Sequence, residues 1–373
     1  MKQRPTPEQV DILVVDDTPD NLRLLSQMLS EHGYGVRAVT SGQRALESAR
    51  MMPPDGYSVC KQLKSDKNTL DIPVIFISAL DDIQDKVKAF QVGGVDYITK
   101  PFQIEEVLAR TETHLALQKL QNELQEVNKK FERELLLAGK MQASFLPNEL
   151  PEIAGWGLSP KLVPALETSG DFFDVFQLPG GNMGLLIADV VDKGVGAALF
   201  MVLSWSLLRT YALEFPTEPE RVLAAVDERI RSDTGADNFV TVFYGVLDPK
   251  QGTLVYSNAG HNSPVLFKAG VGVEPNRMKA TGTPLGILEN QTWERGMVCL
   301  EGGDVCMLYT DGITDAQNGR AEFFGEQRLN KSLDVNAANS AVMIRDGLMR
   351  DVHDFMSGEP LYDDIGLIVL KRE

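Results

Sequence analysis

Residues 187–201 read IADVVDKGVGAALFM, and this stretch decides the class of the C-terminal part of the chain. The apolar run before Asp189 is typical of a buried strand, and the apolar run after Gly194 is typical of a buried helix. An aspartate at the end of a strand beside glycine can hold a cation, but it is more often a turn residue. The interpretation therefore depends on whether the chain carries more sites of this kind.

Three further aspartates have the same setting. Asp171 lies in SGDFFD (169–174), Asp311 in LYTDGITDA (308–316) and Asp363 in YDDIGLIVL (362–370). Carboxylates that converge on one point repel each other unless a cation lies among them, and oxygen-only ligands favour Mg²⁺ or Mn²⁺. The four sites together predict such a centre. Sequence alone does not separate Asp363 from its neighbour Asp364.

Residues 142–370, which carry these motifs, resemble the SpoIIE/RsbU branch of the PP2C-type, metal-dependent protein phosphatases. The matching strings, in the family's order, are SGDFFD, ADVVDKGVGAALFM, NAGHNSPVLF, TGTPLGI, GDVCMLYTDGITDAQN and DDIGLIVL. The resemblance implies an α+β fold, a β-sandwich flanked by helices, with a two-metal centre at one end of the sandwich.

The resemblance also implies a role for each residue. Asp189 would bridge two Mg²⁺ or Mn²⁺ ions, and Asp311 and Asp363 would hold the first ion with it. Asp171 and the backbone carbonyl of Val190 would help to hold the second ion. The ions would lower the pKa of a bridging water, which attacks phosphorus in line. The typical substrate in this family is an anti-sigma-factor antagonist phosphorylated on serine or threonine.

The chain departs from the family pattern at several positions. Gly366 replaces a hydroxyl residue in the last motif, which we expect to affect local support and not metal binding. Asp192 stands where many relatives have glycine, and no phosphate-clamping arginine is identified. His261 could act as a general acid, but its tight turn favours a structural role. Asp174 and Asp315 are either groups that support the ligands or plain surface acids.

The N-terminal part alternates strands and helices, which predicts a doubly wound parallel sheet. Residues 10–115 resemble a response-regulator receiver domain of the flavodoxin-like α/β class. By this resemblance Asp16 and Asp17 would bind one Mg²⁺, Ser78 would supply the switch hydroxyl, and Lys100 would precede a cis-proline. The expected strands are 11–15, 36–39, 74–78 and 96–98, and the expected helices are 22–29, 41–50 and 83–92.

One part of the receiver has no counterpart in the sequence. Residues 51–54 (MMPP) run straight into Asp55, where a receiver carries a third strand that ends in the phosphoacceptor aspartate. Asp55 aligns with the following loop, so no phosphoacceptor aspartate is found. Either the stretch is omitted from the sequence as given, or the receiver is truly shortened. We favour an omission, because loss of a central strand would leave apolar faces unpaired.

Residues 103–145 predict one long helix that links the two domains. Five apolar residues recur at steps of three and four, which is typical of a coiled-coil seam. A parallel homodimer is the preferred partner, and packing of the helix on its own domains is the alternative. We expect a receiver at 1–110, a coiled-coil linker at 111–146 and a phosphatase domain at 147–373. The seam residues are Leu117, Leu120, Leu124, Val127 and Phe131.

Within the phosphatase domain the apolar patterns predict several elements. The expected strands are 184–191, 239–247, 253–258, 264–267, 305–309 and 365–370. The expected helices are 196–211, 218–231 and 338–355, and the first of these should be buried because apolar residues occupy most of its surface.

Composition excludes several classes of function. Acidic residues outnumber basic ones by 53 to 36, giving a formal charge of −17, which disfavours nucleic acid and anionic membranes as partners. No signal region precedes the first strand, and no apolar run approaches the ~20 residues of a membrane span, so a cytoplasmic protein is expected. The three cysteines, without paired spacing, fit a reducing compartment.

Two functions remain open. The first is a two-component response regulator whose output domain is a serine/threonine phosphatase, controlled by a cognate histidine kinase if the receiver is intact. The second is a non-enzymatic signalling adaptor that binds its partner without turnover. The complete set of four aspartates argues for the enzyme.

Overall fold

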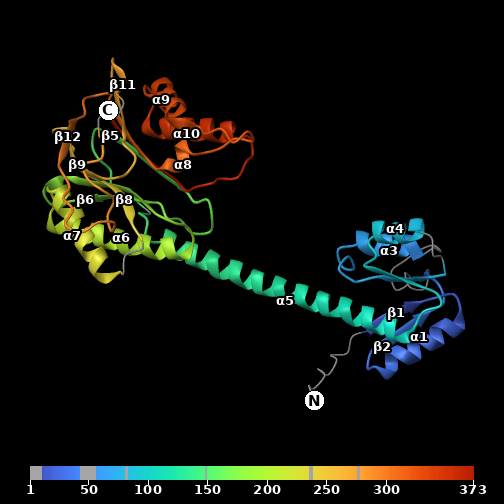
Figure 1. The fold of residues 1–373 in the computed structure, drawn as a ribbon. Helices are drawn as coiled ribbons and strands as arrows, with labels where there is room; N and C mark the ends of the chain where they lie inside the picture. Colours follow the sequence, from blue (N-terminus) through green and yellow to red (C-terminus); the bar gives the residue numbers. More distant parts are fainter. Residues whose placement is uncertain (1–10, 43–55, 80–82, 148, 235–237, 275–277) are drawn as a thin grey trace. The chain divides into compact units, whose positions relative to one another are not determined.

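The computed structural model describes residues 11–42, 56–79, 83–147, 149–234, 238–274 and 278–373. The chain divides into two compact units, Met1–Lys130 and Phe131–Glu373. Figure 1 shows that the N-terminal unit contains the receiver elements and that the C-terminal unit contains the sheets of the phosphatase region. Each unit is described by itself.

The N-terminal unit has two pairs of parallel strands with helices around them. The apolar residues of the strands pack against one face of α1 and against the start of α5, with Val14, Leu25, Ile98 and Val107 in this core. The elements are β1 (Asp11–Val15), α1 (Pro19–Glu31), β2 (Gly35–Val39), α3 (Gly56–Ser65), β3 (Ile75–Ser78), α4 (Ile83–Gln91) and β4 (Asp96–Thr99).

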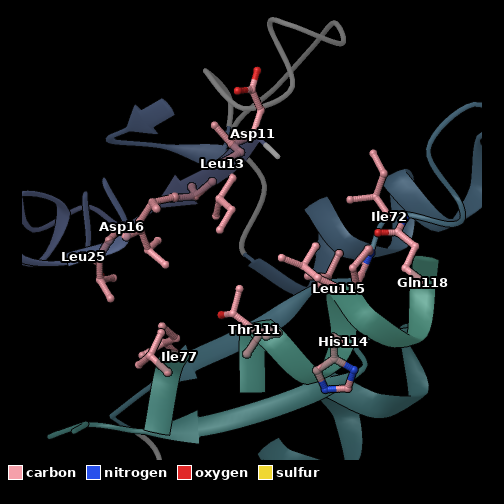
Figure 2. Close-up of a pocket in the computed structure, with 18 of the residues that line it drawn as sticks. Asp11, Leu13, Asp16, Leu25, Ile72, Ile77, Thr111, His114, Leu115 and Gln118 are labelled. Carbon is pink, nitrogen blue, oxygen red and sulfur yellow. The ribbon is translucent and has the colours of Figure 1, made fainter. Parts of the chain in front are cut away.

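The predicted doubly wound sheet is divided into two. β1 pairs with β2 and β3 pairs with β4, and within the described residues no strand joins β1 to β3. A cavity of about 460 Å³ lies between these two strands, as Figure 2 shows. Leu13 and Val15 of β1 remain 48% and 42% exposed. Among the described residues the predicted doubly wound sheet therefore consists of two separate parallel pairs, and the facing edges of β1 and β3 have no strand between them.

The four strands predicted from apolar runs are confirmed to within one residue at each end, as are the helix at 83–92 and the core of the helix at 22–29. The helix predicted at 41–50 falls mostly on residues 43–55, which lie outside the described residues. Helix α3, which begins at Gly56, was not predicted.

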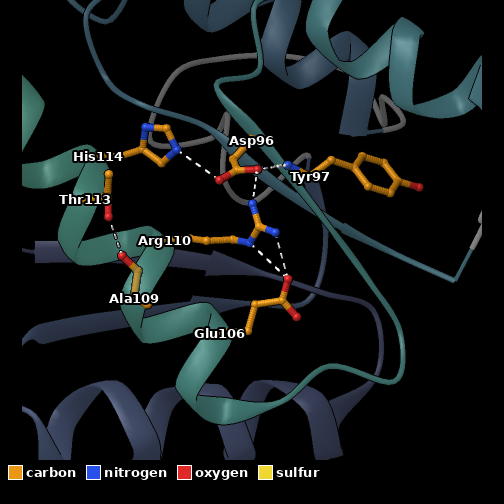
Figure 3. A network of polar contacts seen from close by, with 7 residues as sticks. All are labelled: Asp96, Tyr97, Glu106, Ala109, Arg110, Thr113 and His114. Atoms are coloured by element: carbon orange, nitrogen blue, oxygen red, sulfur yellow. Dashed lines mark hydrogen bonds and ion pairs between the residues drawn. The ribbon is translucent and has the colours of Figure 1, made fainter.

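The linker helix α5 (Ile104–Ala143) starts on the receiver, where a polar network attaches it to β4. The Asp96 carboxylate accepts a hydrogen bond from Arg110 at 2.7 Å and lies 3.1 Å from His114 Nε2 (Figure 3). Glu106 holds the other side of the Arg110 guanidinium at 2.9 Å. Burial raises the pKa of Asp96, but hydrogen bonds from Arg110, the Tyr97 amide and His114 outweigh it, and the net pKa is lowered. These contacts fix the rotation of the first turns of α5 about its axis.

Further along α5, the five predicted seam residues are all exposed, between 54% and 64%. A helix with an uncovered apolar stripe gains little from burial within its own chain. The coiled-coil partner itself stays a prediction.

The C-terminal unit is a sandwich of two five-stranded sheets. The first sheet has the order β11-β10-β13-β14-β5 and the second β12-β9-β8-β7-β6. Their facing sides form a common apolar core that includes Leu185, Phe243 and Ile368. The strands are β5 (Trp156–Val163), β6 (Phe172–Gln177), β7 (Met183–Val190), β8 (Val240–Asp248), β9 (Thr253–Ala259), β10 (Val265–Lys268), β11 (Gly272–Glu274), β12 (Gly296–Cys299), β13 (Val305–Tyr309) and β14 (Ile365–Arg372).

Helices cover the outer face of each sheet. α6 (Val195–Glu214) and α7 (Pro219–Asp233) pack on the second sheet, and α9 (Gly325–Asn336) and α10 (Ala341–Met356) pack on the first. A short helix, α8 (Asp311–Thr314), follows β13. The four layers agree with the predicted β-sandwich flanked by helices. Strands β5, β6, β11 and β12 and helices α8 and α9 were not predicted, because their apolar patterns are short or interrupted by polar residues.

Helix α6 corrects one statement drawn from the sequence. It is long and apolar enough to cross a membrane by length and composition alone, although no such run was recognised. The core helix of a folded domain passes the same test, and α6 buries Ala197, Phe200, Met201, Leu208 and Ala212 against the second sheet. The prediction that this helix lies in the core is confirmed for that face.

Candidate metal centre

The second sheet brings Asp171 and Asp189 to the same end of the sandwich. β6 and β7 pair antiparallel with Phe172 opposite Ala188, so the next residue outward on each strand is one of the two aspartates. Gly170 is required where the loop before β6 passes β7, because a Cβ there would lie 3.0 Å from the carbonyl oxygen of Val190. The loop therefore places Asp171 close to both predicted ligands of β7.

The first sheet brings Asp311 and Asp363 to this end in the same way. β13 and β14 pair with Tyr309 opposite Leu367, and the two aspartates lie just beyond the paired residues. A Cβ at Gly312 would lie 1.9 Å from the carbonyl oxygen of Asp364. Glycine beside the aspartate thus has a steric reason here, since it lets the two ligand-bearing loops touch.

The pKa values show that the four carboxylates act on one another across the two sheets. Burial, and then the charge of Asp311, raise the pKa of Asp189 to about 7. Burial, and then the charge of Asp189, raise the pKa of Asp171 well above its ordinary value. The pKa of Asp311 is raised by burial and by the charge of Asp363. The predicted ligands are therefore brought together as a cluster whose ionised forms repel each other.

Asp363 and Asp364 face different surroundings. The Asp364 carboxylate accepts hydrogen bonds from the Ala165 amide at 2.7 Å, the Gly170 amide at 2.8 Å and the Ser169 hydroxyl at 2.9 Å. It is buried and tied to the loop that precedes Asp171. The Asp363 side chain is 40% exposed and its Oδ1 lies 2.9 Å from Lys193 Nζ. The geometry favours Asp363 as the ligand and Asp364 as the anchor of the loop.

Lys193 is the basic group that meets this cluster at its open side. Its ammonium also donates to the carbonyl of Tyr362, and its charge lowers the pKa of Asp311 against the raising effects of burial and of Asp363. The side chain is well placed to offset part of the cluster's negative charge.

The donor set fits hard divalent ions. Asp171 is 2% exposed, and its Oδ2 is buried without a hydrogen-bond partner among the described residues. A buried carboxylate oxygen in this state is costly unless a proton or a cation satisfies it. Across the same described residues, no three acidic, histidine or cysteine side chains are already gathered at metal-binding distances. The four carboxylates thus form a cluster that ions would have to draw closer together.

Three other candidates lie outside this cluster. Asp174 is fully buried and accepts hydrogen bonds from Trp205 at 3.0 Å and Arg209 at 2.8 Å, so it holds α6 on the second sheet. Asp315 is exposed and acts only as a nearby charge on Asp311. His261 lies 2.8 Å from Thr241 Oγ1, and burial lowers its pKa to about 3. A histidine with this pKa is neutral at pH 7, so the imidazolium form that would act as a general acid is not populated.

The two departures from the family pattern have local explanations. Asp192 has a φ of 74°, in the left-handed region that favours glycine, which accounts for the glycine of many relatives. At Gly366 the backbone amide donates to the Thr310 hydroxyl at 2.7 Å, and a Cβ would lie 3.0 Å from Thr310 Cγ2. A threonine from the neighbouring strand therefore supplies the hydroxyl that the last motif lacks.

The receiver residues also come together. Lys100 Nζ lies 2.7 Å from Asp16 Oδ2, and the Lys100 amide donates to the Ser78 carbonyl at 2.7 Å. Burial raises the pKa of Asp16, but hydrogen bonds from Lys100, Thr18 and Asn21 lower it overall. Asp17 is exposed beside them, and the peptide bond between Lys100 and Pro101 is cis, as predicted.

Comparison with known proteins decides the family. The family described as stage II sporulation protein E (SpoIIE) matches residues 179–373, which is more than half of the chain. The chain belongs to the SpoIIE family. Residues 12–112 match the response regulator receiver domain, so this SpoIIE-family chain is a receiver fused to a PP2C-type domain. The predicted resemblance is confirmed for both parts.

Individual relatives agree with this assignment. Protein IcfG of Synechocystis is 33% identical over 267 residues, 64% of this SpoIIE-family chain and 41% of IcfG. Phosphoserine phosphatase RsbU of Bacillus subtilis is 29% identical over 257 residues, covering 67% of this chain and 73% of RsbU. The SiaA-PP2C domain of Pseudomonas aeruginosa superposes with a TM-score of 0.59 at 20% identity, covering 66% of this chain and 98% of that domain. The last of these shows the fold alone. This chain spans less than half the length of IcfG.

Proposed function

We propose that this chain is a metal-dependent phosphatase that removes phosphate from phosphoserine or phosphothreonine in a partner protein. The observation that carries the proposal is the convergence of Asp171, Asp189, Asp311 and Asp363 from the ends of two sheets, with a buried carboxylate oxygen that has no partner. RsbU, a relative over two thirds of the chain, is named a phosphoserine phosphatase, which favours phosphoserine.

Two Mg²⁺ or Mn²⁺ ions are the cofactors that these residues would hold. Asp189 would hold both ions, Asp311 and Asp363 would hold the first with it, and Asp171 and the Val190 carbonyl would help to hold the second. When bound, the ions would supply a nucleophilic water and neutralise phosphoryl charge. The protein's own part is to fix the four carboxylates, to hold His261 neutral, and to present Lys193 at the open side of the site.

A complete receiver would make the phosphatase a response regulator under a cognate histidine kinase. Its acidic pocket contains Asp16, Asp17, Ser78 and Lys100, and one Mg²⁺ is its expected ion. We propose that the cavity between β1 and β3 marks the place of the third strand and of the phosphoacceptor aspartate. The mass of the intact natural polypeptide tests this: a mass above 41.1 kDa supports an omitted segment, and a mass equal to it supports a shortened receiver.

The linker supports a homodimer as the working form. The five exposed seam residues of α5 would pair in a parallel coiled coil, through which a change in the receiver could reach the phosphatase as a shift of helix register. The partner protein is best sought among anti-sigma-factor antagonists, the substrate class implied by the family. The proposed location is the cytoplasm.

The function is tested by phosphate release from a phosphoseryl peptide with and without Mn²⁺. We expect hydrolysis that depends on Mn²⁺ and that falls at least a hundredfold in Asp189→Asn. Binding of a partner with no hydrolysis by the unaltered chain, at any Mn²⁺ concentration, would instead favour the signalling adaptor.

A further inference from the structure

The last turn of α5 is hydrogen-bonded to the loop that carries Asp171. Gln142 is 7% exposed, and its side chain contacts the backbone of Ser169 at both ends of the amide. Nε2 donates to the Ser169 carbonyl at 2.5 Å, and Oε1 accepts from the Ser169 amide at 2.9 Å. A side chain that satisfies a donor and an acceptor of one buried residue fixes that residue in position and orientation.

The same loop is held from its other side by Asp364. Its Oδ2 accepts from the Gly170 amide at 2.8 Å and lies 2.9 Å from the Ser169 hydroxyl, which also lies 3.0 Å from the carbonyl of Asp171. The loop between Ser169 and Asp171 is thus clamped between one residue of the linker helix and one residue of the first sheet.

The backbone of α5 itself touches this loop. A Cβ at Gly139 would lie 1.9 Å from the carbonyl oxygen of Glu167, so the helix approaches the loop as closely as glycine allows. Asp171 Oδ2 has no hydrogen-bond partner among the described residues, and the rest of this carboxylate interacts with Thr310 and Asp189. The position of the carboxylate therefore depends on these two groups and on the backbone that carries it. Gln142 therefore acts on the site although it does not reach the carboxylate itself.

We propose that Gln142 is a positioning residue that sets the affinity of the Asp171 side of the centre for its metal ion. The proposal rests on the proposed two-metal function, and it adds a residue of the linker helix to the machinery of the site. Groups that orient a metal ligand commonly contribute a factor of about 10 to 100 in metal affinity.

The test measures Mn²⁺ binding to the full chain through the electron paramagnetic resonance signal of the Mn²⁺ that stays free. Gln142→Ala keeps a good helix former and removes both hydrogen bonds. We expect one of the two ions to bind about tenfold more weakly, with the other unchanged. Gln125→Ala, the same change at an exposed position of the same helix, should bind both ions as the unaltered chain does. Equal binding of both ions by Gln142→Ala would overturn the proposal.

A second readout separates positioning from general loss of structure. The Mn²⁺ concentration for half-maximal hydrolysis should rise about tenfold in Gln142→Ala, with kcat restored at saturating Mn²⁺. A lower Tm with unchanged Mn²⁺ constants would mean a structural role only. If the alanine variant does not fold, Gln142→Asn, whose amide is one methylene too short to reach Ser169, takes its place with the same expected results.

Two further variants distinguish failure of this inference from failure of the proposed function. Asp171→Asn should weaken the binding of the same ion. Adding Gln142→Ala to Asp171→Asn should weaken the binding of that ion little further, because both changes act on one ligand. Asp189→Asn should lose both ions and hydrolysis. If Asp189→Asn loses ion binding and hydrolysis while Gln142→Ala binds both ions fully, only the positioning role is rejected. If Asp189→Asn keeps full activity, the two-metal function is rejected.

Discussion

Replacing Asp364 and Asp363 in turn by alanine should separate the anchor from the ligand. The two residues are adjacent, so Asp363→Ala is a matched control for Asp364→Ala. In the metal-free chain, Asp364 accepts hydrogen bonds from the buried loop at Ala165, Ser169 and Gly170. Asp363 makes an ion pair with Lys193 near the surface.

The magnitudes follow from what each truncation leaves behind. Asp364→Ala leaves two backbone amides without an acceptor, and each such buried donor costs about 1–3 kcal/mol. The Ser169 hydroxyl can turn to the Asp171 carbonyl at 3.0 Å, and less repulsion at Asp171 and Asp189 offsets part of the loss. We therefore expect a net loss of about 3 kcal/mol, which corresponds to a fall in Tm of roughly 6–12 °C in a domain of this size.

Asp363→Ala should leave the metal-free Tm within about 2 °C, because an exposed ion pair contributes only ~0–1 kcal/mol and repulsion at Asp311 is relieved. The assay is thermal unfolding by circular dichroism in EDTA and again in Mn²⁺. Addition of Mn²⁺ should raise the Tm of the unaltered chain more than that of Asp363→Ala, because the variant keeps the proposed ligands of only one ion. A large fall for Asp363→Ala in EDTA, with none for Asp364→Ala, would refute the assignment of the two roles.

Three further predictions test other parts of the structure. His261 is neutral in the folded chain because burial lowers its pKa to about 3, whereas the unfolded chain binds a proton below about 6.5. Stability contributed by this group is therefore lost as the pH falls from 6.5 towards 3. Between pH 6 and pH 4, the free energy of unfolding measured in urea should fall by about 2 kcal/mol less in His261→Gln than in the unaltered chain. Equal falls in the two chains would contradict the burial of a neutral histidine. Leu124→Asp should convert a dimer to a monomer in light scattering, whereas Gln125→Asp should stay dimeric, and a monomeric unaltered chain would exclude the coiled coil. Asp192→Gly should raise the free energy of unfolding by up to about 1 kcal/mol, because glycine adopts a φ of 74° without strain, and a decrease would mean that the aspartate side chain has a partner of its own.

Much of the candidate site follows from the sequence because its motifs are local. Asp189 lies at the end of β7 and Asp311 just after β13, and strand pairing within each sheet brings Asp171 to Asp189 and Asp363 to Asp311. The packing of the two sheets then brings the two pairs to one end of the sandwich. The sequence indicates that Gly312 allows a close approach of backbone, but it does not indicate which residue approaches. A Cβ at Gly312 would strike Asp364, a residue of another loop, and only the three-dimensional structure brings that loop against it.

The parts that the sequence does not predict are long-range contacts without a pattern. The hydrogen bonds that Ser169 and Gly170 donate to Asp364 join residues nearly 200 positions apart, and no periodicity indicates them. The contacts of Lys193 with Asp363 and of Gln142 with Ser169 are of the same kind, since polar side chains at turns and helix ends have many possible partners. For the receiver, the alternation of strands and helices predicted a parallel sheet without its third strand. It did not predict that the described strands form two separate pairs.

Crystals of the intact chain grown with Mn²⁺ offer the most direct measurement, through anomalous diffraction at the manganese edge. The account predicts two peaks at the end of the sandwich, one between Asp189, Asp311 and Asp363 and one between Asp189, Asp171 and the Val190 carbonyl. Full occupancy of Mn²⁺ elsewhere in the chain, with no peak beside Asp189, would contradict it.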